Sequence, residues 1–194
     1  KVHAAGWKEM SDAFLRERAT QRGEKCVPFD PVADYDEYVD GLPRSDGVSA
    51  FLASRSIDLP EGKSSDPPAA ETVVGLGDRK NGIVLRMIHE QGVEAYEGSV
   101  RYVRAARAAG LRRAVVSSSS NCREVLVAAK IEDLFEQRID GIVEEREHLK
   151  GKPAPDTVLA GARARGSAPA EAAVVEDGLA GVGAGGGGGG GGGW

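Results

Sequence analysis

Three short stretches of this sequence carry side chains that together could bind and transfer a phosphate group. The first is a hydroxyl-rich run over Ser117–Ser120 followed by Asn121, the second is Lys152, and the third is the acidic pair Glu176–Asp177. Hydroxyl and amide groups can donate hydrogen bonds to phosphate oxygens, and a lysine can neutralise their charge. Two carboxylates can hold Mg²⁺, which takes oxygen ligands and bridges to phosphates.

The elements expected around these stretches would place them at one edge of a sheet. Apolar runs predict short buried strands over residues 113–117 and 173–176, so the hydroxyls and the acidic pair fall at carboxyl ends. Lys152 precedes a helix predicted over residues 154–165, and Pro155 suits its first turn because proline has no N–H to leave unpaired. Helix N-termini attract anions, and parallel α/β sheets bind ligands at the carboxyl ends of their strands.

The second half of the chain alternates between helix and strand. Helices are predicted over residues 99–109, 121–130 and 132–137, and a further strand is predicted over residues 141–143. Strands separated by helices indicate a parallel sheet with right-handed crossovers. The sequence therefore predicts an α/β domain over residues 93–194.

The first half, residues 1–92, is predicted to be a helical domain. His3, Trp7 and Phe14 recur on one face of an amphipathic helix that begins the chain. A turn over Gly41–Arg44 is expected to present the side chain of Arg44. Further helices are predicted over residues 32–39, 46–54 and 70–91.

Composition restricts the class of protein. The 194 residues carry a formal net charge of −5, which argues against nucleic acid or an anionic membrane as a partner. No apolar run approaches the roughly 20 residues that span a bilayer. The two cysteines are too few for a disulfide framework, and the three histidines lack the spacing of zinc ligands. We expect a cytoplasmic, monomeric protein.

Each candidate residue also has a purely structural explanation. Lys152 could be a solvated loop lysine, and the serines and the acidic pair could serve as helix N-caps. Arg44 and Lys80 could be solvated surface residues, while His3 and Trp7 could belong to the core of the first helix. The functional interpretation is favoured for Lys152 because a hydroxyl-rich strand end and an acid pair accompany it.

These stretches resemble the second, third and fourth motifs of the haloacid dehalogenase superfamily. Ser117 lies at the end of the strand in VVSSSSN, Lys152 lies in GKPAPD, and Glu176–Asp177 lies in VVEDGLAGV. The resemblance covers about residues 1–183. It implies a Rossmann-like parallel-sheet core of the haloacid dehalogenase type with a helical-bundle cap domain.

The first half resembles the cap of the β-phosphoglucomutase branch of this superfamily. His3–Lys8 is similar to its H-x-x-x-W-K start, Asp40–Arg44 to its G-x-x-R substrate loop, and Arg79–Asn81 to its R-K-N element. Together these matches favour the β-phosphoglucomutase branch over its phosphatase relatives.

The resemblance implies how the second half would act. An aspartate nucleophile on magnesium would carry a phosphoryl group between positions 1 and 6 of a sugar, through a bisphosphate intermediate. Ser117 and Lys152 would hold the transferring phosphate, and Glu176 and Asp177 would complete the magnesium shell. Further phosphate contacts would come from Ser118, Ser119 and Asn121.

The resemblance also assigns roles to the first half. Arg44, with Gly41 in its loop, would bind the phosphate that is not transferred. His3 and Lys80 would tune the acid/base aspartate and the substrate hydroxyls. Trp7 and Asn81 belong to the same substrate-binding elements.

This sequence departs from the family pattern in two respects. It contains no D-x-D-G-V/I strand, which precedes the cap in this family and carries the nucleophile and the acid/base aspartate. We expect the biological protein to extend upstream of Lys1 and beyond the glycine run of residues 185–193, which we interpret as standing for unassigned side chains. Pro43 lies within the substrate loop and removes one backbone donor there.

Three functions remain open from the sequence. The first is a phosphomutase acting on β-glucose 1-phosphate, with Mg²⁺ as its cofactor and a sugar phosphate as its partner. The second is a small-molecule phosphatase with the same core. The third is a non-catalytic module that binds a sugar phosphate.

Overall fold

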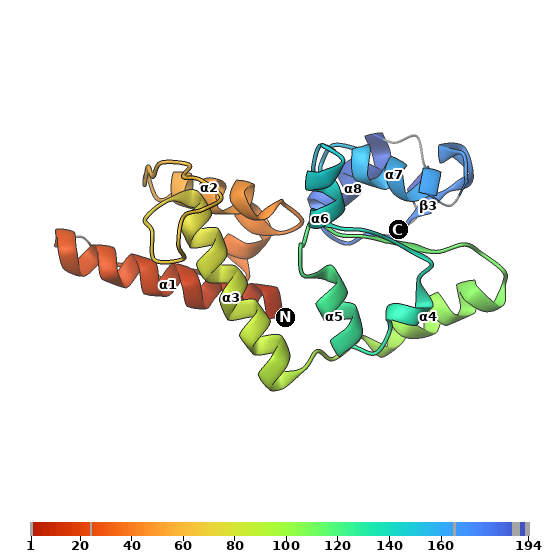
Figure 1. Ribbon diagram of the computed structural model, residues 1–194, viewed down its shortest axis with the longest axis horizontal. Coiled ribbons are helices and arrows are strands. Elements are labelled where there is room, and N and C mark those ends of the chain that lie inside the picture. Colours follow the sequence, from red (N-terminus) through yellow and green to blue (C-terminus); the bar gives the residue numbers. More distant parts are fainter. Residues whose placement is uncertain (1, 24, 165, 188–190, 193–194) are drawn as a thin grey trace. The chain divides into compact units, whose positions relative to one another are not determined.

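The computed structural model divides into two compact units (Figure 1). It describes residues 2–23, 25–164, 166–187 and 191–192. Unit 1 comprises Lys1–Asp40 and Arg44–Gln91, and unit 2 comprises Gly41–Pro43 and Gly92–Trp194. Independent domains over residues 1–92 and 93–194 stay a prediction.

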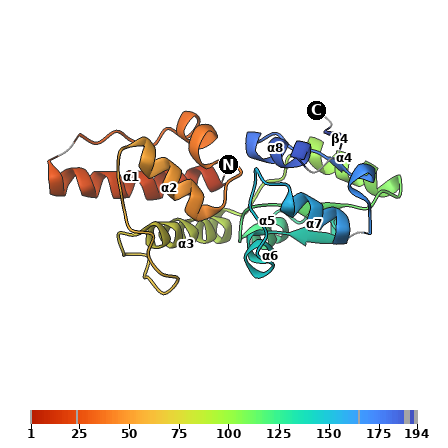
Figure 2. The same cartoon turned by 90° about the horizontal axis from the view of Figure 1, so that it is seen from above.

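Two long helices form the frame of unit 1. Helix α1 (Val2–Arg22) packs against α3 (Val73–Gln91), as Figure 2 also shows. Gly6 permits this close approach, because a Cβ atom at that position would lie 2.5 Å from Cγ2 of Val84. A larger residue at position 6 would therefore push the two helices apart.

The core of unit 1 is one continuous apolar cluster. Helix α2 (Arg44–Ser54) and the short π-helix η1 (Tyr35–Val39) close it on the side away from the α1–α3 frame. The rings of Phe29 and Phe51 meet edge to face with their centroids 5.1 Å apart. The buried members are Trp7, Met10, Phe14, Leu15, Phe29, Val39, Val48, Phe51, Leu52, Val73, Leu76 and Ile83.

The first sheet of unit 2 has two parallel strands. Strand β1 (Ala114–Val116) pairs with β2 (Gln137–Ile139), with Val115 opposite Arg138. Helix α7 (Asp156–Ala164) packs on both strands. It lies close to β1 at Gly161, where a Cβ atom would be 3.2 Å from Cγ2 of Val116.

The second sheet of unit 2 is separate from the first. Strand β3 (Ala173–Val174) pairs in parallel with β4 (Gly191–Gly192), and α8 (Leu179–Gly187) connects them. Within the described ranges the strands thus form two two-stranded sheets rather than one continuous sheet. The predicted parallel, alternating architecture is confirmed.

Short helices complete unit 2. Helix α4 has no buried residue, and α5 follows the hydroxyl-rich run. Their bounds are α4 (Glu97–Ala108), α5 (Cys122–Ala128), η2 (Glu132–Leu134), α6 (Gly141–Arg146) and η3 (Pro169–Glu171). Among the described residues, no helix is both long and apolar enough to cross a bilayer.

The strand predicted over residues 141–143 is wrong, because those residues begin α6. The Asp140 side chain caps this helix by accepting a hydrogen bond from the backbone N–H of Val143, 3.1 Å away. The strand lies earlier, at Gln137–Ile139, and only its first residue falls in the helix predicted over residues 132–137. Pairing with β1 outweighs the polar character of that segment.

Two other boundaries also differ from the sequence expectation. Arg44 was expected in a turn and is instead the first residue of α2. Pro155 was expected inside the first turn of a helix and instead immediately precedes α7, which begins at Asp156. The expected end of that helix at residue 165, and residues 188–190 and 193 of the glycine run, lie outside the described residues.

Candidate functional site

Lys152 is the centre of the charged cluster in unit 2. Its side chain is only 7% exposed, and its ammonium lies 2.6 Å from Oε2 of Glu176. The same nitrogen lies 3.5 Å from the backbone oxygen of Val116, the last residue of β1. Since Glu176 follows β3, one lysine contacts groups at the carboxyl ends of strands from both sheets.

Glu176 is held by the backbone as well as by Lys152. Its Oε1 atom accepts hydrogen bonds from the N–H groups of Asp177 and Gly178, each 3.1 Å away. Burial raises its pKa, but the hydrogen bond and charge of Lys152 outweigh this, so the pKa falls below the usual range of a glutamate. The carboxylate therefore stays ionised beside the lysine at neutral pH.

The carboxylate of Glu176 also requires a glycine on the next helix. A Cβ atom at Gly181 in α8 would lie only 2.1 Å from Oε2 of Glu176. Sequence reasoning missed Gly181, because nothing in the pattern of α8 distinguishes it from the neighbouring glycines. Contact with the carboxylate is what identifies it.

The hydroxyl-rich run forms a tight turn after β1. Ser117 donates its N–H to the backbone oxygen of Ile139 at 2.9 Å, which continues the β1–β2 pairing. The Oγ of Ser117 accepts the N–H of Ser119, and the Oγ of Ser119 accepts the N–H of Asn121, each at 3.1 Å. Asn121 is buried. The serines thus shape their own turn, whereas the N-cap position of α5 is taken by Asn121 rather than by a serine.

Ser118 contacts the segment Gly41–Pro43, which belongs to unit 2. Its hydroxyl donates a 2.9 Å hydrogen bond to the backbone oxygen of Gly41. Gly41 has φ of +70°, a left-handed conformation that favours glycine. A side chain there would also crowd Ala180, whose Cβ would be 3.2 Å away. Backbone conformation and packing therefore both favour a glycine at position 41.

A second charged cluster lies in unit 1 and centres on Lys80. This side chain is 7% exposed, and its ammonium lies 3.4 Å from Nδ1 of His3 and 5.1 Å from the centroid of the Trp7 ring. Burial, followed by the charge of Arg44, lowers the pKa of Lys80 to about 8. Burial and the charge of Lys80 lower the pKa of His3 to about 3. His3 is therefore neutral and can accept from the ammonium.

Arg44 and Asn81 lie on the helices around this second cluster. A guanidinium nitrogen of Arg44 is 3.3 Å from Oδ1 of Asp78, and both side chains are about one third exposed. Asp78 was not among the residues expected from sequence, although it directly precedes the R-K-N element. Asn81 follows Lys80 in α3 and makes interactions of its own.

The acidic pair supplies only part of a metal site. Asp177 is exposed and available as an oxygen ligand, whereas both oxygens of Glu176 already accept hydrogen bonds. Among the residues that the structure describes, no group of three His, Cys, Asp or Glu side chains could hold a metal ion. Carboxylate oxygens are suitable ligands for Mg²⁺, but a complete coordination shell around the ion needs further oxygen ligands.

Comparisons with known proteins agree on one family. A family model described as haloacid dehalogenase-like hydrolase matches residues 2–189. A protein of Mycobacterium bovis named β-phosphoglucomutase is 51% identical over 183 residues, which cover 94% of this chain and 70% of that protein. A relative from Mycobacterium tuberculosis with the same name shows the same identity and coverage.

Solved structures share the fold at lower identity. A β-phosphoglucomutase from Clostridium difficile superimposes with a TM-score of 0.73 at 20% identity, over 98% of this chain and 75% of that one. CbbY from Rhodobacter sphaeroides, solved in complex with xylulose-(1,5)bisphosphate, has a TM-score of 0.70 at 19% identity, over 98% and 77% of the two chains. The expected α/β fold and the resemblance are thereby confirmed, and the chain belongs to the haloacid dehalogenase-like hydrolase family.

Proposed function

We propose that this chain is the greater part of a phosphomutase that interconverts β-D-glucose 1-phosphate and glucose 6-phosphate. The observation that carries the proposal is the buried Lys152 ammonium, held where β1 ends and beside the carboxylate that follows β3. Phosphoryl transfer depends on positioned positive charge, and parallel α/β sheets bind ligands at this edge. The choice of sugar phosphate rests on the 51% identity to proteins named β-phosphoglucomutase.

Lys152 and Ser117 are the proposed catalytic residues. Lys152 neutralises charge on the transferring phosphate, and its present partner Glu176 holds the ammonium in place. Ser117 supplies a hydroxyl where β1 ends, and Ser118, Ser119 and Asn121 supply further donors in the same turn. Phosphate oxygens would then replace some of the hydrogen bonds that the turn makes with itself.

Unit 1 contributes most of the proposed substrate residues. Arg44 binds the phosphate that is not transferred, because it is a cation about one third exposed and paired with the carboxylate of Asp78. Lys80 and neutral His3 tune the substrate hydroxyls and the acid/base group. The ring of Trp7 positions Lys80 through a cation–π contact with its ammonium. Gly41 and Asn81 complete the substrate-binding residues.

Mg²⁺ is the proposed cofactor, and Glu176 and Asp177 would hold it. When bound, the ion would neutralise charge on the phosphate and orient it. The remaining oxygen ligands and the nucleophile would come from an Asp-x-Asp strand supplied by a segment outside these residues. We call the chain preceded by such a segment the completed enzyme. A cytoplasmic location and a monomeric state stay predictions.

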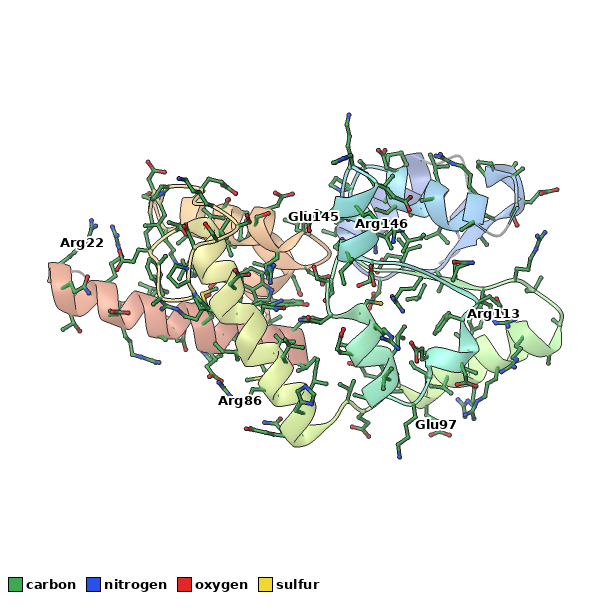
Figure 3. The ribbon with its side chains drawn as sticks, viewed as in Figure 1. Arg22, Arg86, Glu97, Arg113, Glu145 and Arg146 are labelled. Carbon is green, nitrogen blue, oxygen red and sulfur yellow. The ribbon has the colours of Figure 1, made fainter. Side chains whose placement is uncertain are left out.

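The experiment that tests this function replaces Arg44 with alanine in the completed enzyme. Loss of a charge-assisted contact with the distal phosphate should raise KM for glucose 1-phosphate by tenfold or more. Turnover of acetyl phosphate, which has no distal phosphate, should change less than about twofold. The matched control is Arg86→Ala, which removes an exposed arginine of α3 paired with Glu9 (Figure 3).

The same assay separates the candidate functions. Equal losses on both substrates would contradict the role of Arg44. Release of inorganic phosphate without glucose 6-phosphate would favour the phosphatase, which the hydrolase description of the family keeps as the second candidate. Tight binding of the sugar phosphate without either product would favour the non-catalytic module.

A further inference from the structure

Unit 1 contains a cavity that none of the proposed substrate residues lines. Its volume is about 320 Å³, at the lower end of the range for small-molecule sites. It is formed by the C-terminal half of α1, the loop that follows α1, and the residues that follow α2. Neither Arg44 nor Lys80 is part of its wall, so it is separate from the cluster around Lys80.

The wall of this cavity is strongly cationic. Arg18, Lys25 and Arg55 come from three different segments, and the described lining residues include no carboxylate. One guanidinium nitrogen of Arg55 binds Asp34 at 2.6 Å, and its Cζ lies 5.0 Å from the centroid of the Phe51 ring. This arginine is thereby fixed before any ligand arrives. Fixed donors bind anions with a smaller entropic cost than mobile ones.

Arg55 lines the cavity and carries one N–H group without a hydrogen-bond partner among the described residues. This group is its buried Nε–H. A buried N–H group without a partner costs free energy, and a ligand oxygen would remove that cost. The rest of the wall includes apolar side chains, among them Leu15 and Ile57. The ligand that fits has an anionic end and an apolar body.

We propose that this cavity is a binding site for a small organic phosphate monoester. Three cationic side chains on three segments suit the three terminal oxygens of a phosphate better than the single edge of a carboxylate. The volume excludes a nucleic acid strand, and the chain's net charge of −5 does not favour one. Because the site lies on α1 and on the segments that follow α1 and α2, its occupancy would act on the unit that supplies most of the proposed substrate residues.

Cys26 gives a local readout of this site. It lines the cavity and is half-buried, so a bound ligand should shield its thiol from alkylation. The only other cysteine, Cys122, is buried, and burial raises the pKa of its thiol to about 11. Labelling by iodoacetamide at neutral pH therefore reports on Cys26, whatever the catalytic activity of the protein.

The test measures the alkylation rate of the 194-residue chain with phenyl phosphate at low ionic strength. Phenyl phosphate should slow labelling of Cys26 by about tenfold at saturation, and phenylacetate, with the same ring and a carboxylate, should slow it far less. Arg18→Gln should raise the half-protecting concentration by about tenfold or more, because a charge-assisted hydrogen bond is lost. Lys25→Gln, in an exposed loop, should act in the same direction without affecting folding.

Arg22→Gln is the matched control. Arg22 lies at the end of α1, is exposed, and is absent from the cavity wall (Figure 3). Its replacement should change the half-protecting concentration less than about twofold. Unaltered labelling in phenyl phosphate, equal protection by phenylacetate, or protection that survives both Arg18→Gln and Lys25→Gln would each overturn the proposal.

Discussion

Unit 1 and unit 2 differ in how completely they bury their apolar residues. Every member of the continuous core cluster lies in unit 1. Unit 2 buries only a few apolar residues among those described, namely Cys122, Leu126, Leu134, Ile139 and Ala184. Strand β1 is only half-buried, and α4 buries no residue at all.

The two units also differ in what their exposed surface contains. Unit 2 exposes large apolar side chains that α/β proteins normally cover, including Tyr96, Tyr102 and Leu111. Its described strands form two separate pairs, so β1 and β3 each have a paired side and an open side. Unpaired strand edges cost free energy. Among the described residues, unit 1 thus buries its apolar side chains more completely than unit 2 does.

This difference concerns the unit that holds the residues proposed to transfer the phosphate. The proposed phosphate-binding residues Ser117 and Lys152, and the proposed magnesium ligand Glu176, all lie in unit 2. The ion pair of Lys152 with Glu176 is therefore a contact between two residues of the protein, and it differs from the contacts that they would make with a substrate. Three substitutions test the comparison.

The first prediction concerns the core of unit 1. Phe51→Ala should lower the free energy of unfolding by about 3–5 kcal/mol, because it opens a cavity beside Phe29. The matched control in unit 2 is Phe135→Ala, which removes a half-buried ring and should cost less than about half as much. Urea unfolding followed by circular dichroism measures both. Equal losses would show that the two units are equally well packed.

The second prediction concerns Lys152 in the completed enzyme. Lys152→Ala removes one preorganised charge from the site. This substitution should reduce kcat by a factor of about 10²–10³, equivalent to about 3–4 kcal/mol. Lys150→Ala is the matched control, since Lys150 is an exposed lysine two positions away. Steady-state kinetics with glucose 1-phosphate provide the measurement. A loss of less than tenfold, or an equal loss in the control, would contradict a catalytic role.

The third prediction concerns the buried lysine of unit 1. Folding lowers the pKa of Lys80 from 10.5 to about 8, so between these values the unfolded chain binds more protons than the folded one. Its contribution to the free energy of unfolding should therefore rise with pH across this window, by about 3 kcal/mol in total. Below pH 8 the cost of burying the charge is fully present.

Lys80→Met isolates this contribution from other titrating groups. The variant should be more stable than the wild type at pH 7, and the difference should shrink towards zero near pH 10.5. Urea unfolding at half-unit pH intervals measures it. A difference that stays constant from pH 7 to 10.5 would mean that the lysine keeps an ordinary pKa.

Much of the fold could be predicted from the sequence, because local patterns decide it. The apolar spacing of Trp7, Met10 and Phe14 predicted α1, and the apolar run before Ser117 predicted β1. Strand β2 could not be predicted in the same way. Its polar residues Gln137 and Arg138 gain their strand conformation from pairing with β1, which is a tertiary interaction.

The candidate site could be predicted only as a set of residue types at strand ends. That Lys152 would bind Glu176 depends on two side chains 24 positions apart, and no local pattern contains that information. The closeness of Gly181 to the same carboxylate, and of His3 to Lys80, depends equally on packing between helices and loops. The shifted pKa values follow from that burial and are invisible in the sequence.

The most direct test of the account compares the chain Lys1–Trp194 with the completed enzyme. ³¹P NMR would follow the interconversion of β-glucose 1-phosphate and glucose 6-phosphate in the presence of Mg²⁺. We predict no turnover by the 194-residue chain alone, turnover by the completed enzyme, and loss of that turnover when the first aspartate of the added Asp-x-Asp is replaced by asparagine. Interconversion by the chain alone would place the nucleophile within these residues and contradict the proposed site.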